Sequence, residues 1–349
     1  MAPPPIAVLA PKVVAAMTVV LLLAAMVTTA ILVRMALQLR VMDVPVERSA
    51  HTRPIPKGGG IGILGGVVLF AIPVRLSLGA GWPDLSFAAV VVAGVFLGAI
   101  SWADDIHSFA ARYKLGAQGL AALIVIFGTL SPAPLPITGL LCVGGFMWLL
   151  LTTNALNFVD GLNGLCSGCM ALSAAILAAT TMAHAQTLTS AGMAALLILL
   201  ACCLAAFLPF NFPRARIFMG DVGSQGAGLM LAGAAYELTI SGAVPPWLAP
   251  SLLSAILFDV IFTLVRRAWA GHRLAQAHRG HLYQIAVRCG AKPVAITLLH
   301  WMFVGWGAYA ALYIGQTHPS LGLVAVILPQ LAWCAAVCVC ARRRDIGIW

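Results

Sequence analysis

The chain has 349 residues, of which 62% are hydrophobic and only 9% are charged. A soluble domain of this length does not tolerate such a composition, so the sequence predicts a polytopic membrane protein with a single helical domain, residues 1–349. The formal net charge of +10 does not indicate nucleic-acid binding, because lysine and arginine concentrate in the cytoplasmic loops of membrane proteins.

Apolar runs close to the ~20 residues that cross a bilayer recur along nearly the whole chain. We expect an all-α fold with about eleven transmembrane helices, at about 12–36, 60–77, 87–103, 114–131, 137–153, 161–183, 189–208, 222–241, 248–266, 293–315 and 320–340. The first run is too long for the core of a signal peptide, so we expect a retained span. Of the 20 lysines and arginines, only Lys12 and Arg75 then lie near outer ends, which predicts an N-out, C-in orientation.

The nine cysteines do not suggest a disulfide framework, because most of them fall within apolar runs. Cys166 and Cys169 form a CxxC pair, but there is no second pair or nearby histidine to complete a metal site. We therefore expect these two small side chains to pack one helix against another.

The connector at 209–224 is far more polar than a turn between two spans needs. Asn211, Arg214, Arg216 and Asp221 lie in it, between two apolar runs. We expect the next helix to begin near Asp221. Either Asp221 only caps that helix while the arginines anchor the membrane edge, or the connector is part of a functional site.

The first two predicted inner loops carry a cation and a pair of acids. Lys57 precedes three glycines, which can present backbone N–H groups to an anion or merely let two helices approach closely. Asp104 and Asp105 repel each other and need a cation, either Lys114 or a metal. Neighbours on a helix point about 100° apart, so we expect separate roles for the two acids, with hydrated loop carboxylates as the alternative.

The third inner loop combines amides, an acid and glycines, and its polar residues are Asn154, Asn157, Asp160 and Asn163. We interpret it as a bendable turn that reads a planar ligand through hydrogen bonds, with Asp160 free to meet a cation. Ordinary turn chemistry explains Asn-Gly and Asp-Gly equally well.

The last long inner segment is basic and includes His278-Arg279-Gly280-His281. It is suited to hold a diphosphate, although such clusters also serve as topology anchors or contact anionic lipids. A metal on His278 and His281 is disfavoured, since phosphate chemistry with carboxylates present favours magnesium through oxygen. Asp259 lies inside the ninth span, and we expect Arg266 to be its partner.

Together these loops resemble the polyprenyl-phosphate N-acetylhexosamine-1-phosphate transferases. The matching pieces occur in family order on one membrane face, and they are His51 to Pro56 with Gly58 and Gly59, Asp104-Asp105, Asn154 to Leu165, Phe210-Asn211 with Phe218 to Ser224, and His278-x-x-His281. The ending His281-Leu282-Tyr283-Gln284 is more similar to the branch that initiates lipopolysaccharide O-antigen than to the peptidoglycan branch.

The resemblance implies transfer of sugar 1-phosphate from a UDP-N-acetylhexosamine to undecaprenyl phosphate, with release of UMP. It implies a magnesium cofactor, with manganese as an alternative, and a bacterial inner-membrane enzyme whose site faces the cytoplasm. A homodimer is implied only by analogy.

The resemblance also assigns roles to residues. It implies that Asp221 binds the metal and that one of Asp104 and Asp105 deprotonates or orients the lipid phosphate. Asp160 and His281 complete the implied catalytic set, with His281 serving the diphosphate. The implied substrate-binding residues are Lys57, Lys114, Asn154, Asn157, Asn163, Asn211, Phe218, His278 and Arg279, with Phe218 near the uracil. Many family members carry Asp at the position of Asn163, so base or sugar recognition there stays open.

Two other classes of protein remain as alternatives. An intramembrane prenyltransferase or CDP-alcohol phosphotransferase needs acids repeated at three- or four-residue spacing, which residues 104–108 lack. A transporter of an anionic lipid or sugar phosphate would line the membrane interior with charges, where only Asp259 is well placed, and the chain has no clear internal repeat. The sequence leaves open the sugar (GlcNAc, GalNAc, QuiNAc or FucNAc) and the choice between direct attack and an aspartyl-phosphate intermediate.

Overall fold

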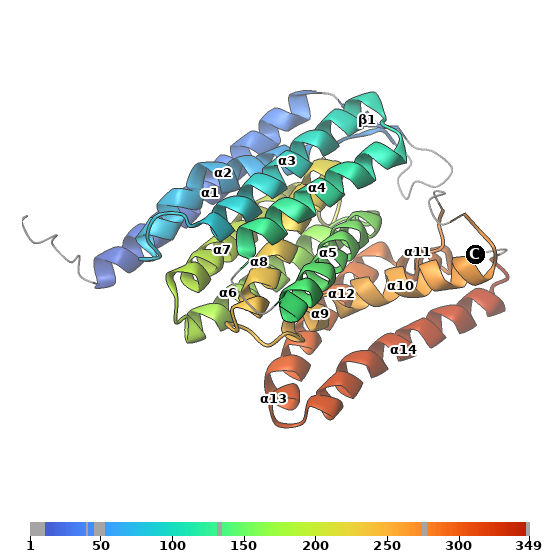
Figure 1. Ribbon diagram of the computed structural model, residues 1–349. Coiled ribbons are helices and arrows are strands. Elements are labelled where there is room, and N and C mark those ends of the chain that lie inside the picture. Colours follow the sequence, from blue (N-terminus) through green and yellow to red (C-terminus); the bar gives the residue numbers. More distant parts are fainter. Residues whose placement is uncertain (1–10, 40, 45–52, 131–134, 274–277, 347–349) are drawn as a thin grey trace, which may run out of the picture.

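The computed structural model describes residues 11–39, 41–44, 53–130, 135–273 and 278–346, and it is almost entirely helical (Figure 1). Its elements are α1 (Pro11–Ala36), η1 (Leu37–Leu39), β1 (Met42–Asp43), β2 (Ile55–Pro56), α2 (Gly59–Ser77), α3 (Leu85–His107), α4 (Ala111–Thr129), α5 (Leu135–Phe158), α6 (Leu165–His184), α7 (Leu188–Asn211), η2 (Val222–Ala227), α8 (Gly228–Ile240), α9 (Leu248–Leu252), α10 (Ser254–Trp269), α11 (Leu282–Arg288), α12 (Pro293–Tyr309), η3 (Ala310–Ile314), α13 (Gly315–Thr317) and α14 (Pro319–Arg343). The motif residues His51 and Thr52 lie outside the described residues.

Eight helical segments of the described ranges are long and apolar enough to cross a membrane, as a polytopic membrane protein requires. They are Lys12–Leu39, Gly59–Ser77, Leu85–His107, Ile137–Phe158, Leu165–His184, Leu188–Asn211, Pro293–Thr317 and Pro319–Arg343. The other three predicted spans are helical too: 114–131 falls largely in α4, whereas 222–241 and 248–266 are divided into η2–α8 and α9–α10. Eleven spans and an N-out orientation stay predictions.

The beginning of α1 and the end of α14 lie at opposite ends of the helical bundle (Figure 1). An odd number of crossings produces this arrangement. The short strands β1 and β2 and the short helix α11 lie at the same end as the last turn of α14, to the right in Figure 1. The polar loops therefore gather at one end of the bundle.

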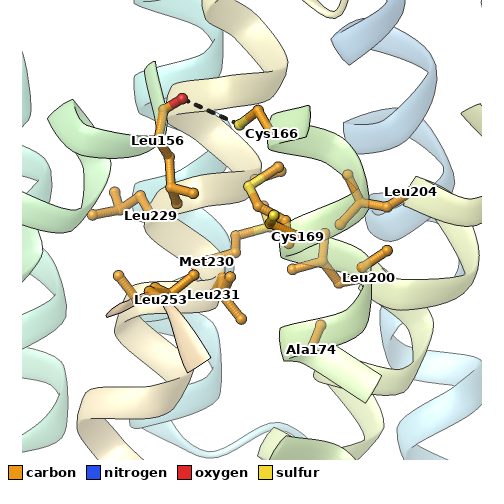
Figure 2. Packing of buried hydrophobic residues seen from close by; sticks show 14 of the residues in the cluster. Leu156, Cys166, Cys169, Ala174, Leu200, Leu204, Leu229, Met230, Leu231 and Leu253 are labelled. Atoms are coloured by element: carbon orange, nitrogen blue, oxygen red, sulfur yellow. Dashed lines mark hydrogen bonds between the residues drawn. The ribbon is translucent and has the colours of Figure 1, made fainter. Parts of the chain in front are cut away.

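The predicted packing role of the CxxC pair is confirmed. Cys166 and Cys169 are buried on α6 among leucines and a methionine of neighbouring helices (Figure 2). The Cys166 thiol donates a hydrogen bond to the Leu156 carbonyl of α5 at 3.1 Å, so this helix contact satisfies a polar group as well as filling space.

The prediction of a bendable turn at Asn154 and Asn157 was wrong. Helix α5 continues to Phe158, beyond the predicted end at 153, so both asparagines lie on its last turns. Residues 154–158 contain no glycine or proline that would end a helix, and the Asn154 amide also donates to the Leu150 carbonyl of its own helix at 2.8 Å. Only residues 159–164 form the turn.

Candidate active site

Backbone pairing joins the first inner loop to the polar connector at 209–224. Phe218 donates its N–H to the Pro56 carbonyl at 2.8 Å, and Gly59 donates to the Phe218 carbonyl at 2.9 Å. Gly58 and Gly220 have φ angles of 107° and 71°, a region in which L side chains are strained. These two glycines let the chain turn sharply beside Lys57 and Asp221.

A close approach of two helices holds the same corner together. A Cβ atom on Gly60 would lie 2.2 Å from the backbone nitrogen of Gly223, so α2 and η2 touch through their backbones. Element η2 is a π-helical stretch at the start of the eighth predicted span. Such stretches are often found at functional sites, and this one begins directly after Asp221.

Three elements hold the side chain of Asp221, and it makes no capping hydrogen bond. Lys114 of α4 lies 3.1 Å from Oδ2, the Asn157 amide of α5 donates to Oδ1 at 2.9 Å, and the Gln225 amide donates to Oδ2 at 3.3 Å. The interpretation of Asp221 as only a helix cap is therefore wrong. The helix does begin near this residue, as predicted.

Asp104 and Asp105 point to different partners, as their helical spacing predicts. Asp104 is buried, forms an ion pair with Lys114 and accepts the backbone N–H of Phe109 at 2.7 Å. Asp105 pairs instead with Lys57 at 3.0 Å. Of the predicted cations, Lys114 or a metal, Lys114 pairs with Asp104, whereas the pairing of Asp105 with Lys57 was not predicted. The two acids occupy separate environments.

A cavity of about 540 Å³ opens where these loops meet. Eight of the predicted site residues line it, namely Lys57, Asp105, Asn157, Asp160, Phe218, Asp221, His278 and Arg279. The other six predicted site residues, Asp104, Lys114, Asn154, Asn163, Asn211 and His281, are not on its wall. With Asp43 of β1, four carboxylates and several cations thus face one space, an arrangement suited to a ligand that carries anionic groups and a metal.

Asp160 lies in the turn between α5 and α6, and its pKa is the most strongly shifted among the acids on this wall. Burial raises the pKa of Asp160 well above its ordinary value of 3.8, and the neighbouring charges of Asp221 and Asp105 raise it further. Among the described residues, no side chain donates a hydrogen bond to this carboxyl group. A cation or donor brought by a ligand would relieve that environment.

The basic residues on the wall differ in charge state. Burial lowers the pKa of Lys57, but the ion pair with Asp105 outweighs this effect and the pKa is raised, so Lys57 stays charged. Burial first, and then the neighbouring His281 and arginine charges, lower the pKa of His278 to about 4. The His278 Nδ1 atom accepts the Gly280 N–H at 3.1 Å, as a neutral imidazole can.

His281 lies behind this wall and is bonded to Asp259. Its Nδ1 atom is 3.1 Å from Asp259 Oδ1, and the two carboxylate oxygens of Asp259 also accept the N–H groups of Leu282 (2.8 Å) and Tyr283 (3.1 Å). The predicted pairing of Asp259 with Arg266 was wrong, because the start of α11 reaches Asp259 first. Arg266 donates instead to the Gly280 carbonyl at 2.7 Å.

The remaining asparagines fasten the loops to one another. Asn211 accepts the Gly164 N–H at 2.6 Å and donates to the Ile217 carbonyl at 3.0 Å. Asn163 donates to the Pro213 carbonyl at 3.1 Å. Because these amides are engaged by the backbone, this geometry favours positioning of the loops over direct contact with a ligand.

Three residues near the site did not stand out in the sequence. Gln118 on α4 exchanges hydrogen bonds with Asn154 and donates to Gln225 at 3.0 Å, and Gln225 donates to Asp221. Asp43 lines the cavity from β1. The signal for the two glutamines was available, since a buried amide within an apolar span needs a partner.

The oxygen donors of the site decide whether it fits magnesium. No three His, Cys, Asp or Glu side chains of the described residues lie close enough to hold a metal by themselves. Magnesium usually takes only one or two carboxylates, together with water and substrate phosphates. A Cβ atom added to Gly220, the residue before Asp221, would lie 3.1 Å from Asp105 Oδ2, so this oxygen lies close to the backbone beside Asp221. Oδ2 of Asp105 is buried and has no hydrogen-bond partner. These two carboxylates fit such a shared ion.

Comparison with known proteins agrees with this geometry. Residues 87–239, which include Asp105, Asp160 and Asp221, match the profile of glycosyl transferase family 4. The chain belongs to this family. The resemblance recognised in the inner loops is thus confirmed.

Several curated relatives extend the likeness over most of the chain. It is 29% identical, over 350 aligned positions, to the decaprenyl-phosphate N-acetylglucosaminephosphotransferase of Mycobacterium leprae, which covers 89% of this chain and 86% of the relative. It is 27% identical over 286 positions to a probable undecaprenyl-phosphate N-acetylglucosaminyl 1-phosphate transferase of Bacillus subtilis (76% and 75% covered). The corresponding values for an undecaprenyl-phosphate alpha-N-acetylglucosaminyl 1-phosphate transferase of Thermotoga maritima are 27% over 241 positions (68% and 70%).

Proposed function

We propose that this family 4 member transfers an N-acetylhexosamine 1-phosphate from a UDP-sugar to undecaprenyl or another polyprenyl phosphate, with release of UMP. Its relatives are named as transferases that act on decaprenyl or undecaprenyl phosphate, which supports the same class of reaction here. We place the protein in a bacterial inner membrane with the site facing the cytoplasm, where it begins an O-antigen or a related cell-envelope glycan.

The observation that carries this proposal is the cavity in which Asp105, Asp160 and Asp221 face Lys57 and Arg279. Phosphoryl transfer asks for positioned cations around the diphosphate and an aligned nucleophile, and needs little covalent chemistry from the protein. An acceptor with an isoprenoid tail must stay in the membrane while its phosphate reaches the loops. A cavity at one end of a bundle of membrane-spanning length meets both needs.

The geometry supports a division of work among the acids. Asp221 and Asp105 would hold magnesium, which when bound supplies the positive charge that neutralises the diphosphate oxygens. Lys114 and the Asn157 amide orient Asp221, and Lys57 orients Asp105. Burial raises the pKa of Asp160, which favours the protonated carboxyl, and a protonated carboxyl can donate a hydrogen bond to an anionic ligand oxygen.

Transport of a lipid or sugar phosphate is less well supported. That function requires charged groups along a path through the membrane. Asp259, the acid placed there by the sequence, is bonded to His281 and to two backbone N–H groups at the start of α11. It therefore acts as an anchor for the basic loop.

The test is a donor panel. Purified protein with magnesium and undecaprenyl phosphate is incubated with UDP-GlcNAc, UDP-GalNAc, UDP-QuiNAc and UDP-FucNAc, and UMP is measured. We expect UMP with at least one donor, and only when the lipid phosphate is present. Folded protein that releases no UMP with any donor would contradict the proposal, and uptake into proteoliposomes without product would favour transport.

A further inference from the structure

A second cavity, of about 310 Å³, lies between the end of α10 and the basic residues at 278–288. At ~30 Å³ per water molecule this space holds about ten waters, enough for a phosphate group. None of the residues that line it is acidic, and six are basic: Arg266, Arg267, His272, His278, Arg279 and Arg288. Neither Asp105 nor Asp221 reaches it. It is a strongly basic compartment that adjoins the larger cavity and shares His278, Arg279 and Arg288 with it.

The arginines of this cavity are held by backbone carbonyl groups. Arg267 donates to the Arg273 carbonyl at 2.8 Å, and Arg288 donates to the Ile346 carbonyl at 2.7 Å. The buried Nε atom of Arg267 has no hydrogen-bond partner, and within the described ranges neither Arg267 nor Arg288 forms an ion pair. Carbonyl oxygens fix the positions of these cations but do not neutralise them, so the arrangement favours an anion between them.

The cavity also lies where lipid headgroups are expected. Ile261, Val265 and Trp269 are 45%, 42% and 87% exposed and recur every four residues on α10, so they form an apolar stripe along one helix face. Tryptophan marks the boundary between hydrocarbon and water in membrane proteins. The next residue, Ala270, lines the cavity. The stripe thus leads along lipid-facing surface to the basic compartment, beside the last turns of α14 (Figure 1).

We propose that this compartment binds the phosphate group of an anionic membrane lipid, with Arg267 and Arg288 as ligands from opposite elements. Basic pockets between helices at the cytoplasmic surface are suited to such headgroups, and the planar guanidinium pairs with two phosphate oxygens at once. The inference rests on the cavity and on the exposed face of α10, and it does not depend on the proposed transferase reaction.

The experiment measures binding rather than catalysis. The full chain, purified in a zwitterionic detergent, is titrated separately with phosphatidylglycerol, undecaprenyl phosphate and inorganic phosphate, and the thermal unfolding midpoint is followed to half-saturation. We expect a saturable rise in the midpoint with at least one of the two lipids. Arg267→Gln should raise the half-saturating concentration about five- to tenfold, because one charge-assisted contact to phosphate is lost.

Matched variants give the control. Arg342→Gln removes an exposed arginine from the last turn of α14, outside the cavity. Its half-saturating lipid concentration should equal that of the wild type. Arg267→Lys keeps the charge and should lose less than Arg267→Gln. If Arg267→Gln does not fold, Arg288→Gln removes the ligand from the opposite wall, at an exposed position. Because Arg288 also lines the larger cavity, the titration with phosphatidylglycerol then carries the test.

The arms separate the sources of the phosphate. Saturation by phosphatidylglycerol alone assigns a phospholipid, and saturation by undecaprenyl phosphate alone assigns the isoprenoid lipid. Saturation by inorganic phosphate as well, lost in the same variants, shows that the phosphate group suffices. Equal half-saturation in wild type, Arg267→Gln and Arg288→Gln would overturn the proposal, as would an equal loss in Arg342→Gln.

Discussion

The two adjacent acids at the end of α3 should respond to substitution in opposite ways. The Asp104 carboxylate is 8% exposed and accepts both the Phe109 N–H at 2.7 Å and the Lys114 ammonium. Asp104→Ala removes a contact of the capping kind, about 1 kcal/mol, and a charge-assisted hydrogen bond, about 1.5–3 kcal/mol. The free energy of unfolding should therefore fall by about 2–4 kcal/mol, and the thermal midpoint should fall by several degrees.

Asp105→Ala should leave stability nearly intact. The Asp105 carboxylate is 7% exposed and Lys57 is 23% exposed. The cost of burying this carboxylate and its repulsion by Asp221 offset the attraction to Lys57, so the ion pair contributes little to stability. The substitution also removes a buried oxygen that has no hydrogen-bond partner. Because Asp105 lines the cavity, its loss should lower UMP release roughly 10²- to 10³-fold, the usual effect of removing one group that stabilises charge in a transition state.

Thermal unfolding and UMP release, measured on the same two preparations, test this contrast. Asp104→Asn and Asp105→Asn serve as isosteric controls. Asp104→Asn should lose stability, but less than Asp104→Ala does, and Asp105→Asn should lose activity with little loss of stability. The reasoning is refuted if Asp104→Ala unfolds at the wild-type midpoint. It is equally refuted if Asp105→Ala keeps wild-type activity.

Three further substitutions probe other parts of the site. The folded protein holds the Asp160 proton more tightly than the unfolded chain, so the free energy of unfolding falls as the pH rises through the raised pKa. Asp160→Asn should remove this pH-dependent loss. Denaturation of both proteins at pH 5 and at pH 8 would detect the difference. Gln225→Leu removes an amide that orients Asp221, the proposed metal-binding acid. The magnesium concentration for half-maximal activity should therefore rise by roughly 10- to 100-fold. An unchanged concentration would exclude this role for Gln225. Gly60→Ala should cost about 1–3 kcal/mol in an unfolding assay, because its Cβ would lie 2.2 Å from the Gly223 nitrogen, while Gly116→Ala, which meets nothing within 4 Å, should be tolerated.

Much of the site could be predicted because polar residues stand out against an apolar chain. Asp105, Asp160 and Asp221 lie at the ends of apolar runs, where acids are costly unless they have a function, and all three line the cavity. The helical spacing of Asp104 and Asp105 correctly predicted different environments. These conclusions need only local sequence and the membrane boundary.

The rest depends on contacts between distant segments. Nothing in the local sequence shows that the start of α11 reaches Asp259, or that Asn211 is engaged by the backbone of two loops. The hydrogen bond from Gln118 to Gln225 joins two apolar segments, and the partners of such a bond can be assigned only after the helices are packed. The π-helical turn after Asp221 also has no local signal, since it follows from close packing against α2.

The central claim is that this cavity transfers a sugar phosphate, and not a sugar alone, to a lipid. The most direct measurement supplies UDP-N-acetylhexosamine labelled with ³²P at the β-phosphorus, together with magnesium and undecaprenyl phosphate, and follows the label. The account predicts that the label enters the lipid fraction in equal amount to the UMP released, and that Asp221→Ala abolishes both while the protein stays folded. Label that remains in UDP, or transfer that survives in Asp221→Ala, would contradict it.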